Sequence, residues 1–257
     1  MEHLLLALVL LPITPTTLQP IKEVMLDMAL TSFDDQYLGC SHLMEEELVA
    51  LNRTELTTNK VYADNWFQAT TEWRRRWKKT SSPSTRLNPQ QEVAILAYTM
   101  QQSLYQVFNV AVREAGRSRE DYLTSFNFKV LHFLLTQALV ALKASQSHQK
   151  CHQVYRGIKG IHFTTIPQGI VRFGHFTSTS LKKEKALSFG QDTIFVVNTC
   201  YGVPIQDFSY YPDEEEVLIP PYETFQVTNV TQHGGTVIIQ LRSQSTFSSY
   251  NCEWVAG

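Results

Sequence analysis

The sequence lacks the short motifs that mark several common enzyme classes. It contains neither a GxGxxG nor a GxxxxGK[ST] loop, so the two usual nucleotide cradles are absent. It has no HExxH and no GxSxG, which argues against zincin and α/β-hydrolase chemistry. Its four cysteines form no CxxC pair and its eight histidines are scattered, so we expect no metal centre.

An excess of basic charge is also missing. The chain has 22 Lys and Arg residues against 24 Asp and Glu residues, which gives a formal net charge of −2. This balance predicts no nucleic-acid partner. The one basic run, RRRWKK at residues 74–79, is typical of the solvated face of a helix.

Long apolar runs are scarce. Leu4–Leu11 is a short apolar core that ends in Pro and Thr, and it is too short to span a bilayer as a helix. We interpret residues 1–20 as a cleaved signal peptide. The apolar stretch Leu131–Leu142 is better explained as a buried helix. We expect residues 21–257 to form a single domain without stable membrane insertion, and no glycolipid-anchor signal follows Trp254 in this chain.

The cysteines are even in number. After a signal peptide, four cysteines predict two disulfides, with three possible pairings. A nested pairing is favoured, because Cys151 leads into one predicted strand and Cys200 ends another, while Cys40 and Cys252 lie near the two ends. Spacing alone leaves the other pairings open. Asn52 and Asn229 each begin an Asn-x-Thr acceptor sequence for glycosylation.

The chain changes character near residue 151. Before it, apolar residues recur at helical spacing and predict helices over Met44–Leu51, Asp64–Lys78, Gln90–Ala115 (one or two helices), Arg119–Phe126 and Phe128–Ala144. After it, short β-branched and aromatic runs predict strands over Gln153–Arg156, His162–Thr164, Val171–Phe173, Phe176–Ser180, Thr193–Thr199, Glu215–Ile219, Thr224–Val230 and Thr236–Arg242. Lys182–Phe189 is a short helix between them. A helical part (21–150) before a strand-rich part (151–254) indicates an α+β fold.

Two short pieces of the strand-rich part could carry chemistry. VYRG places Arg156 at the end of an apolar strand, and an arginine fork suits phosphate or carboxylate. FTSTS places Ser178 and Ser180 on one face of a strand, where hydroxyl groups can hold neighbouring side chains. Each piece alone is better explained as an ordinary strand edge.

The third piece, YYPDEEEVLIP, crowds four carboxylates against a strand. Strand alternation predicts Glu214 and Glu216 on one face and Glu215 on the other, with Asp213 and Glu215 as solvated bystanders. Two adjacent carboxylates repel unless a cation lies between them. A cationic substrate or transition state would relieve that repulsion. A solvated acidic turn or a calcium ligand set are the alternatives, although no DxDxDG loop is present.

In this order, the three pieces resemble the Arg–Ser–Glu signature of arginine-specific mono-ADP-ribosyltransferases. From about Met25 to Trp254 the chain is similar to the vertebrate secreted and cell-surface ecto-ADP-ribosyltransferases, in runs such as LDMALTSFDDQYLGC, NKVYADNW, AVREAGRSR, FKVLHFLLTQAL, CHQVYRG and EEEVLIPPYETFQV. The resemblance implies helices packed beside a split, mostly antiparallel β core that forms an NAD cleft. It implies NAD as co-substrate, no metal, and the pairs Cys40–Cys252 and Cys151–Cys200.

The resemblance also implies roles for individual residues. Arg156 would bind NAD near its phosphates and nicotinamide-side ribose, and Gly157 would offer backbone groups to the nicotinamide amide. Ser178 would brace the site. Glu216 would contact the ribose and stabilise an oxocarbenium-like transition state, and Glu214 would orient and help deprotonate the acceptor guanidinium. Two further assignments are Phe189, as the aromatic side chain against nicotinamide, and residues 208–213, as the turn that recognises the acceptor.

The expected activity is therefore the transfer of ADP-ribose from NAD to arginine-containing proteins, with release of nicotinamide. Two alternatives stay open: an NAD glycohydrolase that uses water as its main acceptor, and a catalytically silent secreted binding protein. The expected location is outside the cell or in the secretory lumen. A cell-surface location would require a longer form with a glycolipid anchor.

Overall fold

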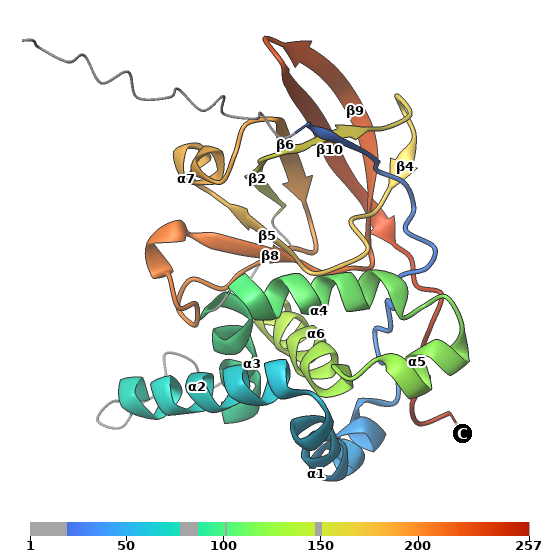
Figure 1. Cartoon of the computed structure of the whole chain (residues 1–257), viewed down its shortest axis with the longest axis vertical. Helices are drawn as coiled ribbons and strands as arrows, with labels where there is room; N and C mark the ends of the chain where they lie inside the picture. The colour runs from blue at the N-terminus through green and yellow to red at the C-terminus, as the bar shows by residue number, and fades with distance from the viewer. Residues whose placement is uncertain (1–19, 78–86, 101, 147–150, 257) are drawn as a thin grey trace, which may run out of the picture.

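The computed structural model describes residues 20–77, 87–100, 102–146 and 151–256 (Figure 1). The predicted signal peptide lies outside the described residues except for its last position. Within the described residues, no single helix has the length and apolar character needed to cross a membrane. Two consecutive helices, α5 (Arg119–Ser125) and α6 (Lys129–Ala144), meet these criteria only when taken together, and they are bent by 106° at the break between them.

Six helices precede residue 151 in the described chain, and they lie where the apolar spacing predicted them. They are α1 (Ser41–Thr58), α2 (Lys60–Trp77), α3 (Pro89–Met100), α4 (Gln102–Glu114), α5 (Arg119–Ser125) and α6 (Lys129–Ala144). Helix α1 is longer at both ends than the predicted Met44–Leu51. Asn59 separates it from α2, where the Asn59 side chain accepts a hydrogen bond from the Tyr62 amide and caps the new helix.

The second half forms an eight-stranded sheet in the order β4-β9-β10-β6-β2-β5-β8-β7. Its strands are β2 (His152–Ile158), β4 (Ile170–Val171), β5 (Thr177–Ser180), β6 (Thr193–Thr199), β7 (Val203–Pro204), β8 (Glu216–Ile219), β9 (Glu223–His233) and β10 (Thr236–Thr246). All its pairs are antiparallel except β10 with β6. The predicted α+β fold with a mostly antiparallel core is confirmed.

Three short elements were not predicted from the sequence. β1 (Lys22–Met25) pairs in parallel with β3 (Ile161–Thr164) as a separate two-stranded sheet. β7 has only two residues. The 3₁₀ helix η1 (Pro212–Glu214) ends just before the predicted Glu215–Ile219 strand, which begins one residue later than predicted, at Glu216. Elements of two to four residues carry too few side chains to establish a periodicity, so pattern analysis does not detect them.

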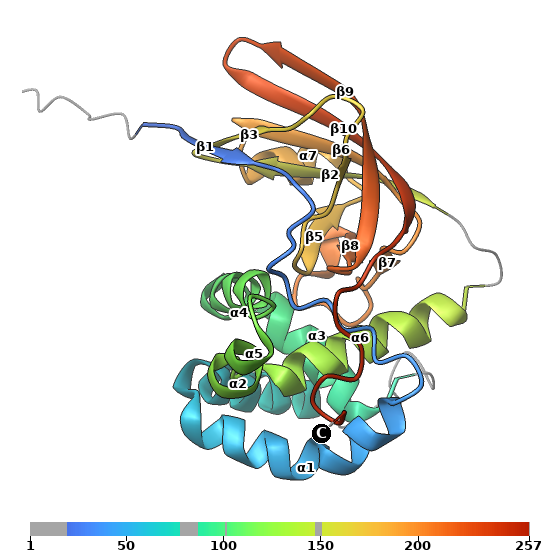
Figure 2. The same cartoon turned by 90° about the vertical axis from the view of Figure 1, so that its right-hand side faces the viewer.

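The sheet is split between β2 and β5. β2 pairs with β6 at seven positions, but with β5 only at Tyr155 opposite Ser180. Beyond that position the two strands separate, which leaves β5-β8-β7 as a smaller group between the helices and the larger group of strands (Figures 1 and 2). Leu218 of β8 packs into the helical core, whereas Val217 and Ile219 pack into the sheet core.

Several contacts tie distant parts of the chain together. The disulfide Cys40–Cys252 joins the C-terminal segment to the start of α1, and Cys151–Cys200 joins β2 to β6 within the sheet. A buried ion pair joins Arg172 to Asp34, whose second carboxylate oxygen accepts hydrogen bonds from the amides of residues 249 and 250. The N-terminal segment, the middle of the chain and the C-terminal segment therefore meet at one buried site.

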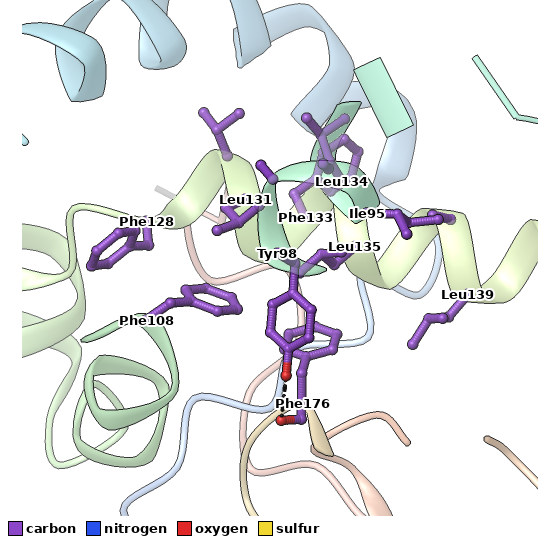
Figure 3. Close-up of a cluster of buried hydrophobic side chains, with 14 of the residues drawn as sticks. Ile95, Tyr98, Phe108, Phe128, Leu131, Phe133, Leu134, Leu135, Leu139 and Phe176 are labelled. Atoms are coloured by element: carbon purple, nitrogen blue, oxygen red, sulfur yellow. Dashed lines mark hydrogen bonds between the residues drawn. The ribbon is translucent and has the colours of Figure 1, made fainter. Parts of the chain in front are cut away.

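Tyr98 links the helical core to the split. Its ring packs among buried side chains of α6 such as Leu131 and Leu135, and its hydroxyl donates to the carbonyl of Phe176 at 2.9 Å (Figure 3). Phe176 directly precedes β5. Helix α3 therefore positions β5 and, through it, the residues at the split.

Candidate active site

Arg156 bridges the split in the sheet. It lies on β2, one residue past the single position where β2 pairs with β5. Its half-buried guanidinium donates from Nη1 to the carbonyl oxygen of Ser178 on β5 at 2.6 Å. A planar guanidinium has further donors beyond the one that Ser178 uses, and these suit an anion such as a phosphate.

Gly157, the next residue, sits where a side chain cannot fit. A Cβ atom there would lie 2.2 Å from the carbonyl oxygen of Gly190 and 2.4 Å from that of Ala186. The missing side chain lets α7 (Lys183–Ser188) pack directly on β2. Phe189 follows α7 and is 53% exposed, so its ring remains available to a ligand.

Ser178 and Glu216 share one face of the smaller group of strands. Glu216, the first residue of β8, lies opposite Ser180, and Ser178 lies opposite Leu218. Directly opposed residues of antiparallel strands point to the same face, and so do alternate residues of one strand. A hydrogen bond from Ser178 to the Glu216 carboxylate is consistent with this arrangement.

Glu216 is buried, with only 5% of its surface exposed. Burial raises its pKa to about 7, the neighbouring charge of Glu214 also raises it, and the hydrogen bond from Ser178 and the charge of Arg156 lower it. The Ser209 hydroxyl lies 3.5 Å from Glu216 Oε2. A buried carboxyl group with a pKa near neutrality, beside a charged partner, is typical of a catalytic position.

The prediction that Glu214 and Glu216 alternate along one strand is wrong. Glu214 ends η1, Glu215 has the left-handed angles φ 45° and ψ 51°, and Glu216 begins β8. A left-handed residue therefore lies between the two glutamates, in place of strand alternation, and the charge of Glu214 still acts on Glu216. Glu214 is half-buried. Burial raises its pKa, and the positive charge of Lys185 partly offsets this by lowering it.

Glu215 is also not a simple solvated bystander. Its carboxylate forms an ion pair with Lys182 at 2.8 Å, and its carbonyl accepts a hydrogen bond from the Leu181 amide at 3.2 Å. The Ser180 hydroxyl donates to the carbonyl of Glu214 at 2.5 Å. The junction between β5 and α7 thus holds the turn that carries Glu214. Asp213, by contrast, is exposed as predicted.

Metal ligation and a charged histidine both lack support among the described residues of this site. In the part of the chain that the structure describes, no three His, Cys, Asp or Glu side chains are grouped so that they could hold a metal ion. His175 lies near Arg156, but burial and the charges of Arg113 and Arg156 lower its pKa to about 3, so its imidazole is neutral.

Sequence reasoning missed the contribution of the helical part. The buried Tyr98 interacts with Ser178, and its hydroxyl also accepts a hydrogen bond from Asn109 at 3.0 Å. Arg76 of α2 contacts the loop that carries Ser209. Neither residue belongs to a motif, and the only signal in the sequence was the basic run at 74–79, which we interpreted as a solvated face.

The arrangement can be compared with known proteins. A family model described as NAD:arginine ADP-ribosyltransferase matches residues 26–249. The chain is 55% identical over 260 residues to the erythroblast NAD(P)(+)–arginine ADP-ribosyltransferase of Gallus gallus, covering 98% of this chain and 86% of that protein. It is 49% identical over 246 residues to the GPI-linked NAD(P)(+)–arginine ADP-ribosyltransferase 1 of Homo sapiens, covering 91% and 75%.

Solved structures give a consistent result. The crystal structure of the eucaryotic mono-ADP-ribosyltransferase ART2.2 superimposes with a TM-score of 0.77 at 38% identity, covering 91% of this chain and 100% of that one. A Glu-to-Ile mutant of ART2.2 in complex with NAD gives a TM-score of 0.75 at the same identity and coverage. The helical part and the split sheet are therefore shared as one arrangement.

Proposed function

The chain belongs to the NAD:arginine ADP-ribosyltransferase family, and from this premise we propose that it transfers ADP-ribose from NAD to arginine side chains of proteins and releases nicotinamide. The observation that carries this proposal is the buried Glu216 at the split of the sheet, with Arg156 and Ser178 beside it and Glu214 one turn away. The site offers one carboxylate to each of two cations.

Binding of NAD uses the residues that line the split. Arg156 holds the phosphates through the guanidinium donors that its contact with Ser178 leaves free. Gly157 permits α7 to lie close to β2, and its backbone receives the nicotinamide amide. Phe189, exposed at the end of α7, packs on the nicotinamide ring.

Glu216 acts on the bond that breaks. Cleavage of the C–N bond leaves positive charge on the ribose, while the electron pair departs with nicotinamide. A fixed carboxylate where that charge develops lowers the barrier, as in glycoside hydrolysis. The Ser178 hydroxyl favours the ionised form of Glu216, since a hydrogen bond to a carboxylate lowers its pKa.

Glu214 acts on the acceptor. It is less buried than Glu216 and lies at the end of η1, next to residues 208–213, the turn proposed to recognise the acceptor. Its carboxylate attracts the incoming guanidinium and takes the proton that is lost when nitrogen bonds to the ribose carbon. A raised pKa makes it a better base than an ordinary glutamate.

The compartment follows from the disulfides. Two disulfides, one of them closing most of the chain, are typical of secreted and lumenal proteins. We propose that residues 1–20 are a cleaved signal peptide and that residues 21–257 act as a single domain outside the cell or in the secretory lumen. Relatives named GPI-linked suggest a cell-surface location for a form that carries such an anchor.

The test is product analysis with adenine-labelled NAD and agmatine, an arginine analogue, on the secreted protein. Wild type should give labelled agmatine and nicotinamide, and Glu216→Gln should give neither while remaining folded. Glu214→Gln should still release nicotinamide but lose the agmatine product. Glu46→Gln removes an exposed carboxylate of α1, outside the proposed site, and should behave as wild type.

The other outcomes identify the alternatives. Nicotinamide release by wild type without an agmatine product would identify an NAD glycohydrolase. Absence of NAD binding in calorimetry would indicate a silent binding protein. Normal transfer by a folded Glu216→Gln variant would show that the role assigned to Glu216 is wrong.

A further inference from the structure

Arg76 lies in a different environment from the rest of its basic run. It is near the end of α2, next to Arg75, and both guanidinium groups pair with the carboxylate of Glu72. The Arg75 side chain is 72% exposed, as expected for a solvated face, whereas that of Arg76 is 21% exposed. Arg76 is therefore turned inward, toward the strand-rich part.

The contacts of Arg76 are with the loop before η1. Its Nη1 donates to the carbonyl oxygen of Ser209 at 2.9 Å, and its Nη2 reaches that of Tyr210 at 3.4 Å. Its guanidinium carbon lies 5.3 Å from the centre of the Tyr210 ring. A second helix contributes from the same side, because the Thr99 hydroxyl of α3 accepts from the Tyr210 amide at 3.0 Å.

This loop leads to both carboxylates of the proposed site. The Ser209 hydroxyl lies 3.5 Å from Glu216 Oε2 and accepts from the Tyr211 amide at 3.1 Å. The Tyr211 carbonyl in turn accepts from the Glu214 amide at 3.1 Å, which starts η1. The end of α2 and the turn that carries η1 lie on the same side of the molecule, at the left of Figure 1.

We propose that Arg76 is a positioning residue for the acceptor: it holds Ser209 and Tyr210 so that Glu214 meets the incoming guanidinium. The proposal rests on the function proposed above and extends it to a residue of the helical part. Because Arg76 binds the backbone of the turn, it acts on the acceptor site through the turn.

The two carboxylates depend on this turn to different degrees. Glu216 belongs to β8, where pairing with β5 and the bond from the Ile205 amide to its carbonyl fix its backbone. Glu214 lies in η1, outside any strand, and its position depends on the turn and on the contacts of Ser180 and Lys182. Loosening the turn should therefore displace Glu214 more than Glu216.

The experiment separates the two half-reactions in the secreted full chain. Transfer to agmatine requires both carboxylates, whereas hydrolysis of NAD without agmatine requires only Glu216. Arg76→Gln removes the contacts with the turn. Arg75→Gln is the matched control, because it removes the same charge from the same helix and the same partner Glu72. Thr99→Val tests the second anchor of Tyr210 at nearly constant volume.

For Arg76→Gln we expect kcat/KM for agmatine to fall about 10-fold or more, because a displacement of about 1 Å can cost 10²-fold in rate. The rate of NAD hydrolysis and the KM for NAD of Arg76→Gln should stay within about two-fold of the wild-type values. All kinetic constants of Arg75→Gln should do the same, because that substitution changes only the surface. Thr99→Val should reproduce the selective loss, and Arg76→Lys, which retains a donor, should recover part of it.

Three outcomes would overturn the proposal, with folding checked by thermal unfolding. In the first, Arg76→Gln transfers ADP-ribose to agmatine as well as Arg75→Gln does. In the second, Arg76→Gln loses transfer and NAD hydrolysis in equal proportion. In the third, Thr99→Val keeps full transfer activity. These failures are distinct from failure of the proposed function, which would appear as absence of agmatine transfer in the wild type.

Discussion

Replacing Glu216 by Gln should make the protein more stable at neutral and alkaline pH while it abolishes transfer. The pKa of Glu216 rises from the ordinary 4.5 to about 7, mainly because burial penalises the charged form. The side chain is only 5% exposed, so solvent offers little screening. A site that holds a buried charge for catalysis costs stability, and a neutral isostere should recover it.

The expected size follows from the two pKa values. Their difference is about 2.5, and at 1.36 kcal/mol for each pH unit the ionised side chain costs about 3 kcal/mol in the folded state. Between pH 4.5 and about 7 the folded state binds more protons than the unfolded state. The free energy of unfolding of the wild type should therefore fall as pH rises through this window and level off above it.

The glutamine of this variant cannot titrate, so the difference in stability between variant and wild type should grow from near zero at about pH 4.5 to about 3 kcal/mol at about pH 8. Urea unfolding with the disulfides intact, at both pH values, measures it. Asp213→Asn, at an exposed position, is the control and should show no such growth. Equal stability of Glu216→Gln and wild type at the higher pH, or a difference that does not change with pH, would refute the reasoning.

Three further predictions concern activity, packing and modification. First, kcat/KM for NAD should increase with pH through about 7, because the free enzyme needs Glu216 ionised; a flat profile from about pH 5 to 9 would contradict this. Second, Gly157→Ala should lower the free energy of unfolding by about 1–3 kcal/mol and raise the KM for NAD, because the new Cβ forces α7 away from β2. Thermal unfolding and NAD kinetics measure these two effects, and an unchanged KM would argue against a role for α7 in binding NAD. Third, Asn229 is exposed on β9, so Asn229→Gln should increase the gel mobility of the secreted protein by the loss of one glycan, and unchanged mobility would show that the site is not used.

The second acceptor sequence has a different setting. Asn52 lies within α1, and its side-chain oxygen accepts a hydrogen bond from the Tyr62 hydroxyl at 2.9 Å. Tyr62 is fully buried. The side chain of Asn52 thus has a structural contact within the fold, and glycosylation stays a prediction from the sequence at both positions.

Much of the fold could be predicted from local patterns. The apolar repeat of Phe128–Ala144 predicted α6 to within one residue, and Thr193–Thr199 coincides with β6. These segments are long enough for burial to impose a periodicity on the side chains. The family signature likewise singled out Arg156, Ser178 and Glu216, because each of its motifs is short and local; the structure brings these residues to the split, and their roles stay predictions.

The relation between Glu214 and Glu216 could not be predicted in this way. It depends on the left-handed backbone of Glu215, a conformation uncommon outside glycine and invisible in a run of three glutamates. Contacts with Leu181 and Lys182, which lie more than thirty residues earlier in the chain, hold that conformation.

The sequence by itself determined the helical and strand-rich parts, the cysteines available for pairing, and the chemistry that the site can perform, because periodicity and residue type are local properties. Only the tertiary structure decided how far Glu216 is buried and which helices support the turn beside it. Arg76 meets Ser209 across 133 residues of sequence. Such contacts arise from the packing of one layer on another, and packing leaves no periodic signal in either segment.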